Sequence, residues 1–113
     1  MLVAFTFPAK PGKEEELKKL LGDPDAGRRA ARLLGATRNT LFFSQGRMIR
    51  VLEFPDGAEP PSMTEIIEQN PDFERFMRQL GPLIEGGFDL DRPGSLEEFS
   101  RRITYPLVFD LRP

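Results

Sequence analysis

Arg50 is the side chain whose position most strongly indicates chemistry. It lies in the middle of the run Arg47–Phe54, where Met48 and Leu52 share its face because side chains alternate along a strand. A charged group among apolar neighbours is costly unless it is paired or solvated. We therefore expect one of two arrangements: an ion pair with a helix carboxylate such as Glu74, or a place in the wall of a binding pocket.

The residue types that are absent restrict this chemistry further. The chain contains no histidine and no cysteine. It therefore has no imidazole base, no thiolate nucleophile, no disulfide and none of the ligands that haem, zinc and copper sites usually use. Any reaction must depend on Arg, Lys, Asp, Glu, Tyr, Ser or Thr, or on binding and orientation alone. We expect the protein to need no metal and no other cofactor.

Composition limits the class of protein. The 113 residues are enough for a single domain, 1–113, and 39% hydrophobic with 30% charged residues is typical of a soluble globular protein. The net charge of −2 argues against nucleic-acid binding, because there is no basic excess to displace counterions. No apolar run approaches the roughly 20 residues that span a membrane, and no signal peptide opens the chain. We expect a cytoplasmic protein that binds neither nucleic acid nor membrane.

Hydrophobic periodicity predicts the elements that position Arg50. The predicted strands are 2–7, 37–44, 47–54 and 103–111, and the predicted helices are 13–21, 25–34, 62–70, 71–80 and 95–102. Gln45-Gly46 joins the two central strands as a tight turn, because glycine accepts a positive φ. Capping boxes at Ser62–Glu65 and Ser95–Glu98 mark two helix starts. Residues 55–61 are a loop by composition.

Three further patterns bear on packing and binding. Phe73, Phe76, Met77 and Leu80 repeat at the spacing of one helix face, which is typical of a core stripe or of a ligand-binding wall. Pro106 cannot donate a ladder hydrogen bond, so the last strand should be an edge strand or carry a bulge. The basic residues of the helix 25–34 are either solvated or rim a pocket for an anionic ligand. They are Arg28, Arg29 and Arg32.

The order strand, helix, strand, strand, helix, strand predicts a ferredoxin-like βαββαβ fold of the α+β class, with helices on one face of an antiparallel sheet. The central hairpin is apolar on both faces, so we expect it at the centre of a sheet that is covered on two sides. A second copy of the sheet is the simplest cover for the face without helices. The pattern therefore predicts a homodimer, a dimeric α+β barrel, with a pocket between sheet and helices in each subunit.

Four segments of the chain carry a family resemblance: FPAKPGKEEELKKLL, LFFSQGRMIRVLEF, NPDFERFMRQLGPLIE and SLEEFSRRITYPLV. They resemble SchA/CurD-like proteins, which are encoded with bacterial aromatic polyketide synthases. A more distant likeness is to tetracenomycin-type aromatic polyketide cyclases, which share the dimeric α+β barrel. The resemblance implies an aromatic polyketide intermediate as substrate, and components of the polyketide synthase as further partners.

The likeness to the cyclases also suggests roles for individual residues. Arg50 falls where the cyclases place a histidine inside the pocket, and Arg38 and Asn39 fall on a segment where they carry arginines. Ring closure of a poly-β-ketone is an aldol condensation, and an arginine could stabilise its enolate oxygen because it stays protonated and presents fixed donors. We predict Arg50 for this role, with Arg38 or Asn39 assisting and Tyr105 as a further donor. The predicted substrate-binding wall consists of Met48, Leu52, Phe73, Phe76 and Met77.

Two other functions remain open at this stage. The same barrel supports a cofactor-independent monooxygenase, in which the carbanion of a polyketide intermediate reacts with oxygen. A non-catalytic accessory subunit of the polyketide synthase would instead bind and shape the nascent chain. The absence of histidine favours orientation or binding over an oxygenase that must deprotonate a phenol.

Overall fold

One antiparallel sheet of four strands forms the base of the fold. The computed structural model describes residues 1–59 and 61–113; the predicted loop 55–61 therefore includes one residue, 60, that lies outside the described residues. The strands are β1 (Leu2–Pro8), β2 (Arg38–Ser44), β3 (Arg47–Glu53) and β4 (Thr104–Tyr105), in the order β2-β3-β1-β4. This order is that of a ferredoxin-like fold, so the predicted α+β class is confirmed.

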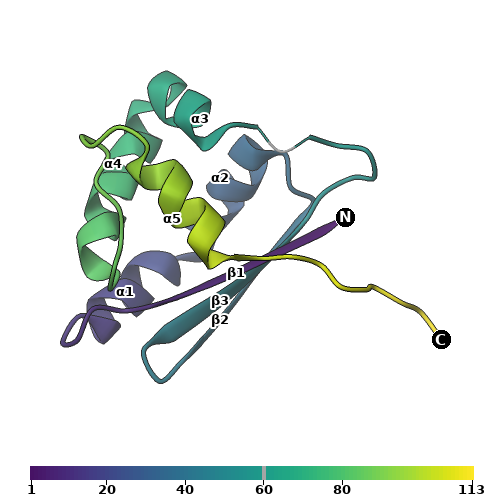
Figure 1. Ribbon diagram of the computed structural model, residues 1–113, viewed down its shortest axis with the longest axis horizontal. Helices are drawn as coiled ribbons and strands as arrows, with labels where there is room; N and C mark the ends of the chain where they lie inside the picture. Colours follow the sequence, from purple (N-terminus) through teal and green to yellow (C-terminus); the bar gives the residue numbers. More distant parts are fainter. Residues whose placement is uncertain (60) are drawn as a thin grey trace.

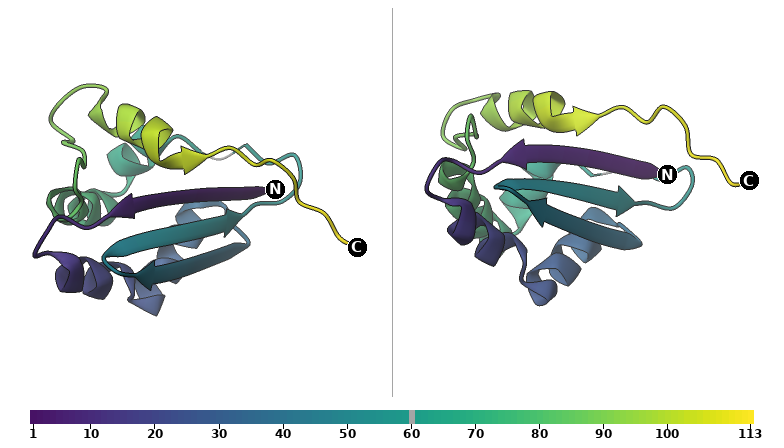
Figure 2. Two further views of the ribbon diagram at one scale, coloured as in Figure 1. Left: turned by 60° about the horizontal axis from the view of Figure 1, so that its bottom comes forward. Right: turned by 90° about the horizontal axis from the view of Figure 1, so that it is seen from below.

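The helices gather on one side of the sheet (Figure 1). They are α1 (Glu14–Leu21), α2 (Pro24–Leu34), α3 (Met63–Gln69), α4 (Pro71–Leu80), the 3-10 helix η1 (Gly81–Leu83) and α5 (Ser95–Ile103). In both views of Figure 2 no helix crosses the near face of β1, β3 and β2. Within the described ranges, no helix is both long and apolar enough to cross a bilayer.

The central hairpin has the predicted turn and the predicted faces. Gln45 and Gly46 have φ values of 50° and 74°, as in the two-residue turns whose twist matches that of the flanking strands. Along β3, Arg50 lies opposite Phe5 of β1 and Leu41 of β2. The hairpin is not at the centre of the sheet, however, because the two internal strands are β3 and β1. β2 is an edge strand and has no second neighbour among the described strands.

The hydrophobic core lies between the inner face of the sheet and the helices. Leu17 of α1 and Met48 of β3 are almost completely buried. Phe99 of α5 packs against Phe7 of β1, with ring centroids 5.7 Å apart, and against Phe88, at 5.1 Å. Such tilted ring pairs add to the stabilisation that burial of apolar area already provides.

α2 is held differently from the other helices that cover the sheet. Asp23 caps it by accepting the backbone N–H of Asp25 at 3.1 Å, and Pro24 occupies its first turn. None of its residues is fully buried, and the apolar side chain of Leu33 is exposed. The side-chain amide of Asn39 in β2 donates a hydrogen bond to the backbone carbonyl of Gly27 in α2 at 3.0 Å, which connects the helix to the sheet. The loose packing of α2 leaves space beside the sheet.

Helix capping follows local sequence at one predicted box and departs from it at the other. Ser62 accepts the N–H of Glu65 at 3.5 Å, as predicted. The second box is wrong: Gly94 is the N-cap of α5, and Ser95 is already inside the helix. The buried Ser95 hydroxyl instead accepts the backbone N–H of Asp89 at 2.9 Å, because the preceding loop folds back over the helix start.

The predicted last strand, 103–111, is much shorter in the structure. Ile103 ends α5, and β4 contains only Thr104 and Tyr105. Tyr105 pairs with Ala4, so β1 has few residues left to pair with a longer β4, and Pro106 supplies no donor. Residues 106–113 run away from the body of the molecule (Figure 1) with several apolar side chains exposed.

Candidate functional site

An apolar cavity of about 300 Å³ lies between the inner face of the sheet and the helices; we call it the apolar cavity. β1 and β3 form its floor, and α4 and α5 contribute much of its wall. It is lined by all five residues of the predicted substrate-binding wall: Met48, Leu52, Phe73, Phe76 and Met77. Alternation along β3 and helical spacing along α4 bring these residues together; their contact with a substrate stays a prediction.

Arg50 is the one charged residue among the described residues that line the apolar cavity. Its Nε is buried and has no hydrogen-bond partner in the described part of the chain. Burial lowers the pKa of Arg50 from its ordinary value, because a low-dielectric environment disfavours the charged form. The guanidinium nevertheless stays protonated in proteins. It is therefore a mostly buried cation whose Nε donates to no described group of the chain.

The alternative ion pair with Glu74 is absent. The carboxylate of Glu74 lies 3.5 Å from Arg78 Nη2, one turn further along α4. No other described carboxylate lies within salt-bridge distance of Arg50. Arg50 is thus a cavity residue, and the ion-pair hypothesis is wrong.

Arg50 also lines a second, polar hollow of about 630 Å³, which we call the basic hollow. It lies where the end of α1 and one face of α2 meet the edge strand β2, and it shares Leu21 and Arg50 with the apolar cavity. Its charged lining residues are Asp23, Arg28, Arg32, Arg38 and Arg50. Arg50 therefore lies at the boundary between an apolar compartment and a basic one.

Asn39 belongs to the basic hollow and not to the apolar cavity. Its Nδ2 is used in the bond to Gly27, whereas its Oδ1 is buried and has no partner among the described residues. Buried polar atoms usually have a partner, so an unpaired acceptor and an unpaired donor on residues that line one hollow are unusual. Both atoms, Arg50 Nε and Asn39 Oδ1, come from the inner face of the β2–β3 hairpin.

The two other predicted catalytic residues lie elsewhere. Arg38, at the start of β2, is opposite Glu53 and reaches both the basic hollow and a groove on the outer face of the sheet. Tyr105 is opposite Ala4 on the outer face and is 60% exposed. The structure thus brings Arg50, Asn39 and Arg38 to one hollow and leaves Tyr105 of the same chain on the other side of the sheet.

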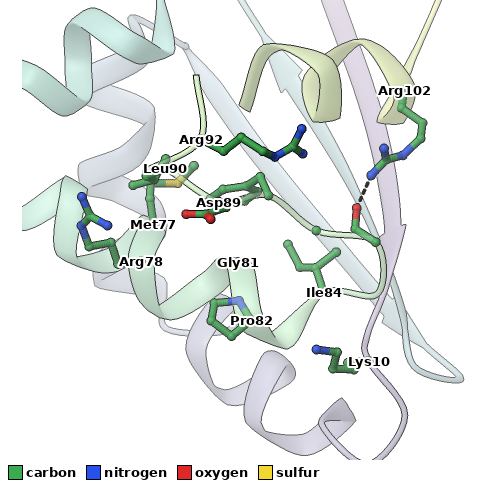
Figure 3. A pocket seen from close by; sticks show the side chains of 13 residues that line it. Lys10, Met77, Arg78, Gly81, Pro82, Ile84, Asp89, Leu90, Arg92 and Arg102 are labelled. Carbon is green, nitrogen blue, oxygen red and sulfur yellow. Dashed lines mark hydrogen bonds between the residues drawn. The ribbon is translucent and has the colours of Figure 1, made fainter. Parts of the chain in front are cut away.

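A third hollow, which was not predicted, is shown in Figure 3. It has a volume of about 680 Å³ and lies between α4, η1, the loop 84–92 and α5; we call it the loop hollow. Arg78 contacts Asp91 at 3.2 Å, Arg92 donates to Ser95 Oγ at 3.2 Å, and Arg102 donates to the carbonyl of Gly86. The hydrogen bond and charge of Asp91 raise the pKa of Arg78. These arginines hold the loop in place.

Metal-ligating side chains do not cluster in the structure. Across 1–59 and 61–113, no group of three or more His, Cys, Asp or Glu residues is arranged so that it could hold a metal ion.

Comparison with known proteins gives one informative similarity. No protein-family model matches the chain. The chain is 31% identical over 109 residues to a 42.8 kDa protein in the whiE locus of Streptomyces coelicolor. The matched region is 93% of this chain but 26% of that protein, so the chain spans about a quarter of the length of this curated relative. The resemblance to SchA/CurD-like proteins is carried by four segments of the sequence, within 7–21, 41–54, 70–85 and 95–108.

Proposed function

We propose that this protein acts in aromatic polyketide biosynthesis as a cyclase-like enzyme that folds a poly-β-ketone in the apolar cavity and promotes aldol ring closure. The observation that carries the proposal is the unpaired guanidinium of Arg50 in the wall of an otherwise apolar cavity. The resemblance to SchA/CurD-like proteins supports the substrate class. The similarity to the protein in the whiE locus supports the same biosynthetic involvement.

Aldol ring closure needs two contributions from the protein: a cavity that orients the chain and a positive charge that stabilises an oxyanion. A methylene between two ketones loses a proton to solvent, and its carbon then attacks a further ketone of the chain. The new carbon–carbon bond closes the ring, and the oxygen of the attacked ketone becomes a hydroxyl by taking a proton. Loss of water then forms a double bond in the closed ring. An apolar cavity folds the chain so that the two carbons meet, which removes an entropic barrier. Arg50 stabilises the negative oxygen that forms at each step, and burial strengthens that interaction.

The size of the cavity agrees with this use. About 300 Å³ is at the lower end of the range of small-molecule sites, and a small number of polar groups in an apolar lining is their usual composition. Besides Arg50, the polar lining includes the hydroxyl residues Ser100 and Thr104. No carboxylate appears among the described lining residues, so solvent accepts the proton in our proposal.

Arg50→Met tests the proposal, because methionine is apolar and of similar length. Affinity for an aromatic polyketide analogue should fall at least tenfold, the loss of one charge-assisted hydrogen bond of about 1.5–3 kcal/mol. The thermal midpoint should stay the same or rise, since an unpaired buried charge is removed. Arg75→Met, at an exposed position of α4, is the matched control and should bind normally. Strong destabilisation of Arg50→Met with intact affinity would assign Arg50 to the scaffold instead.

The assay should also separate the proposed cyclase from the two other functions. A cyclase converts a poly-β-ketone substrate without consuming oxygen. A monooxygenase consumes one molecule of oxygen for each product formed. An accessory subunit binds the analogue with the same dependence on Arg50 but gives no turnover. Parallel measurement of binding, product and oxygen therefore distinguishes all three.

We also propose that two copies of the chain pack sheet to sheet as a homodimer. On the outer face Phe42 is 59% exposed and Ile49 is 45% exposed, and Tyr105 adds to the same surface. Contiguous exposed apolar patches of this kind usually mark an interface. Sedimentation should give twice the chain mass of 12.8 kDa. The double variant Phe42→Lys, Ile49→Lys should be monomeric, whereas Leu33→Lys on α2 should not; a monomeric parent protein would contradict the proposal.

A further inference from the structure

The basic hollow carries more positive charge than the fold uses. Its lining includes four arginines and one carboxylate, that of Asp23. Asp23 is engaged as the cap of α2, and Arg28 is paired with Asp25 at 2.8 Å. Arg32, Arg38 and Arg50 have no hydrogen bond or ion pair to any described residue. Several unpaired guanidinium groups around one hollow repel each other, and a bound anion would remove that repulsion.

The hollow also adjoins the apolar cavity. Leu21 and Arg50 line both spaces, so a ligand can have an apolar part on one side of Arg50 and a charged part on the other. The neighbouring surface of α2 adds Arg29, which lines a further hollow of about 400 Å³ together with Arg32. The positive charge is thus concentrated where the apolar cavity meets the surface of α2.

We propose that the basic hollow is an anion site, which holds a phosphate or carboxylate group of a ligand whose apolar part occupies the apolar cavity. This inference rests on the proposed function in assigning the apolar part to the cavity. The substrate class is therefore an amphipathic anion, such as an acyl chain attached to a phosphodiester linker or a free acid. Arginine suits both groups because its planar donors match the oxygens of carboxylate and phosphate.

Three amphiphiles of one chain length separate the contributions: octyl phosphate, octanoate and octanol, measured by calorimetric titration at low salt. At least one anion should bind tenfold or more tightly than octanol, and added salt should reduce the difference because it screens charge. Tighter binding of octyl phosphate than of octanoate assigns a phosphate group, and the reverse order assigns a carboxylate. Equal affinity of all three ligands would overturn the anion site.

The double variant Arg28→Met, Arg32→Met tests the location of the site. Both residues lie on the exposed surface of α2, so the fold should persist, and circular dichroism checks this directly. Affinity for the preferred anion should fall at least fivefold while that for octanol is unchanged. The control variant Arg75→Met, Arg101→Met changes the net charge equally but lies outside the hollow. An equal loss in both double variants would overturn the proposal.

Inorganic phosphate separates failure of this inference from failure of the proposed function. If phosphate binds with the same dependence on Arg28 and Arg32 while octanol does not bind, the basic hollow is supported and the apolar cavity fails as a ligand site. If octanol binds while neither the anionic amphiphiles nor phosphate show the arginine dependence, the cavity stands and the anion site is overturned.

Discussion

The basic hollow and the loop hollow are similar in size, about 630 and 680 Å³, and both are rimmed by arginines, yet the arginines are used differently. In the loop hollow Arg78, Arg92 and Arg102 each bond to a carboxylate, a hydroxyl or a carbonyl of the chain itself. In the basic hollow Arg50 has no such partner among the described residues. Arginine content alone therefore does not identify a binding site; what matters is whether the fold leaves the guanidinium unpaired.

The pKa values of Arg78 and Arg50 shift in opposite directions, in agreement with the difference in their pairing. The carboxylate of Asp91 raises the pKa of Arg78, because it stabilises the charged form. Burial without a partner lowers the pKa of Arg50. Folding therefore stabilises the charged form of Arg78 and destabilises the charged form of Arg50. A residue of the second kind weakens the fold unless a ligand compensates it, which is typical of functional sites.

The largest expected effect on stability comes from adding a side chain at Gly87, which lines the loop hollow. A Cβ at position 87 would lie 2.5 Å from the carbonyl oxygen of Gly81 and 3.1 Å from that of Ile84. Gly87→Ala should therefore lower the free energy of unfolding by about 1–3 kcal/mol, as overpacking does. Chemical denaturation measures this change. An unchanged midpoint would mean that the loop relaxes freely, and that its arginines do not hold it.

Gly27→Ala is the matched substitution at the basic hollow, and it should raise the free energy of unfolding where Gly87→Ala lowers it. A Cβ at position 27 would approach Asn39 Nδ2 at 3.6 Å, an ordinary contact. Alanine inside α2 should then stabilise the protein by about 0.5–1 kcal/mol, because it restricts the unfolded chain and favours the helix. The same denaturation experiment tests it. Destabilisation would show that α2 packs more tightly against β2 than its exposed residues indicate.

Arg78→Met should have the smallest effect and sharpens the contrast with Arg50→Met. Removing Arg78 leaves Asp91 and Glu74 without their shared partner, so the thermal midpoint should fall slightly. Both carboxylates are partly exposed, and solvent screens the loss. Affinity for a polyketide analogue should not change, whereas Arg50→Met should change affinity and not lower the midpoint. If Arg78→Met weakened binding, the two hollows would not differ in the way we describe.

The main elements of the fold were predictable because their signals are local. Period-2 alternation identified the face of β3 that carries Met48, Arg50 and Leu52, and the 3.6-residue period placed Phe73 and Phe76 together on α4. The cap at Ser62 was also readable, since it involves residues three positions apart. The prediction of a capping box at Ser95–Glu98 was wrong because the Ser95 hydroxyl accepts the N–H of Asp89, in the loop before the helix. The four residues of the box contain no information on the path of that loop. The last strand failed because a strand needs a partner, and β1 has few residues left to pair with it.

The sequence by itself therefore determined which side chains share a face, and with them the lining of the apolar cavity. The tertiary structure decided which charges find partners, because these depend on residues distant in the chain. Glu74 was a reasonable partner for Arg50 in the sequence, but helical spacing places it beside Arg78. The meeting of α2 with the β2 edge, which creates the basic hollow around Arg50, likewise follows only from how the helix packs on the sheet.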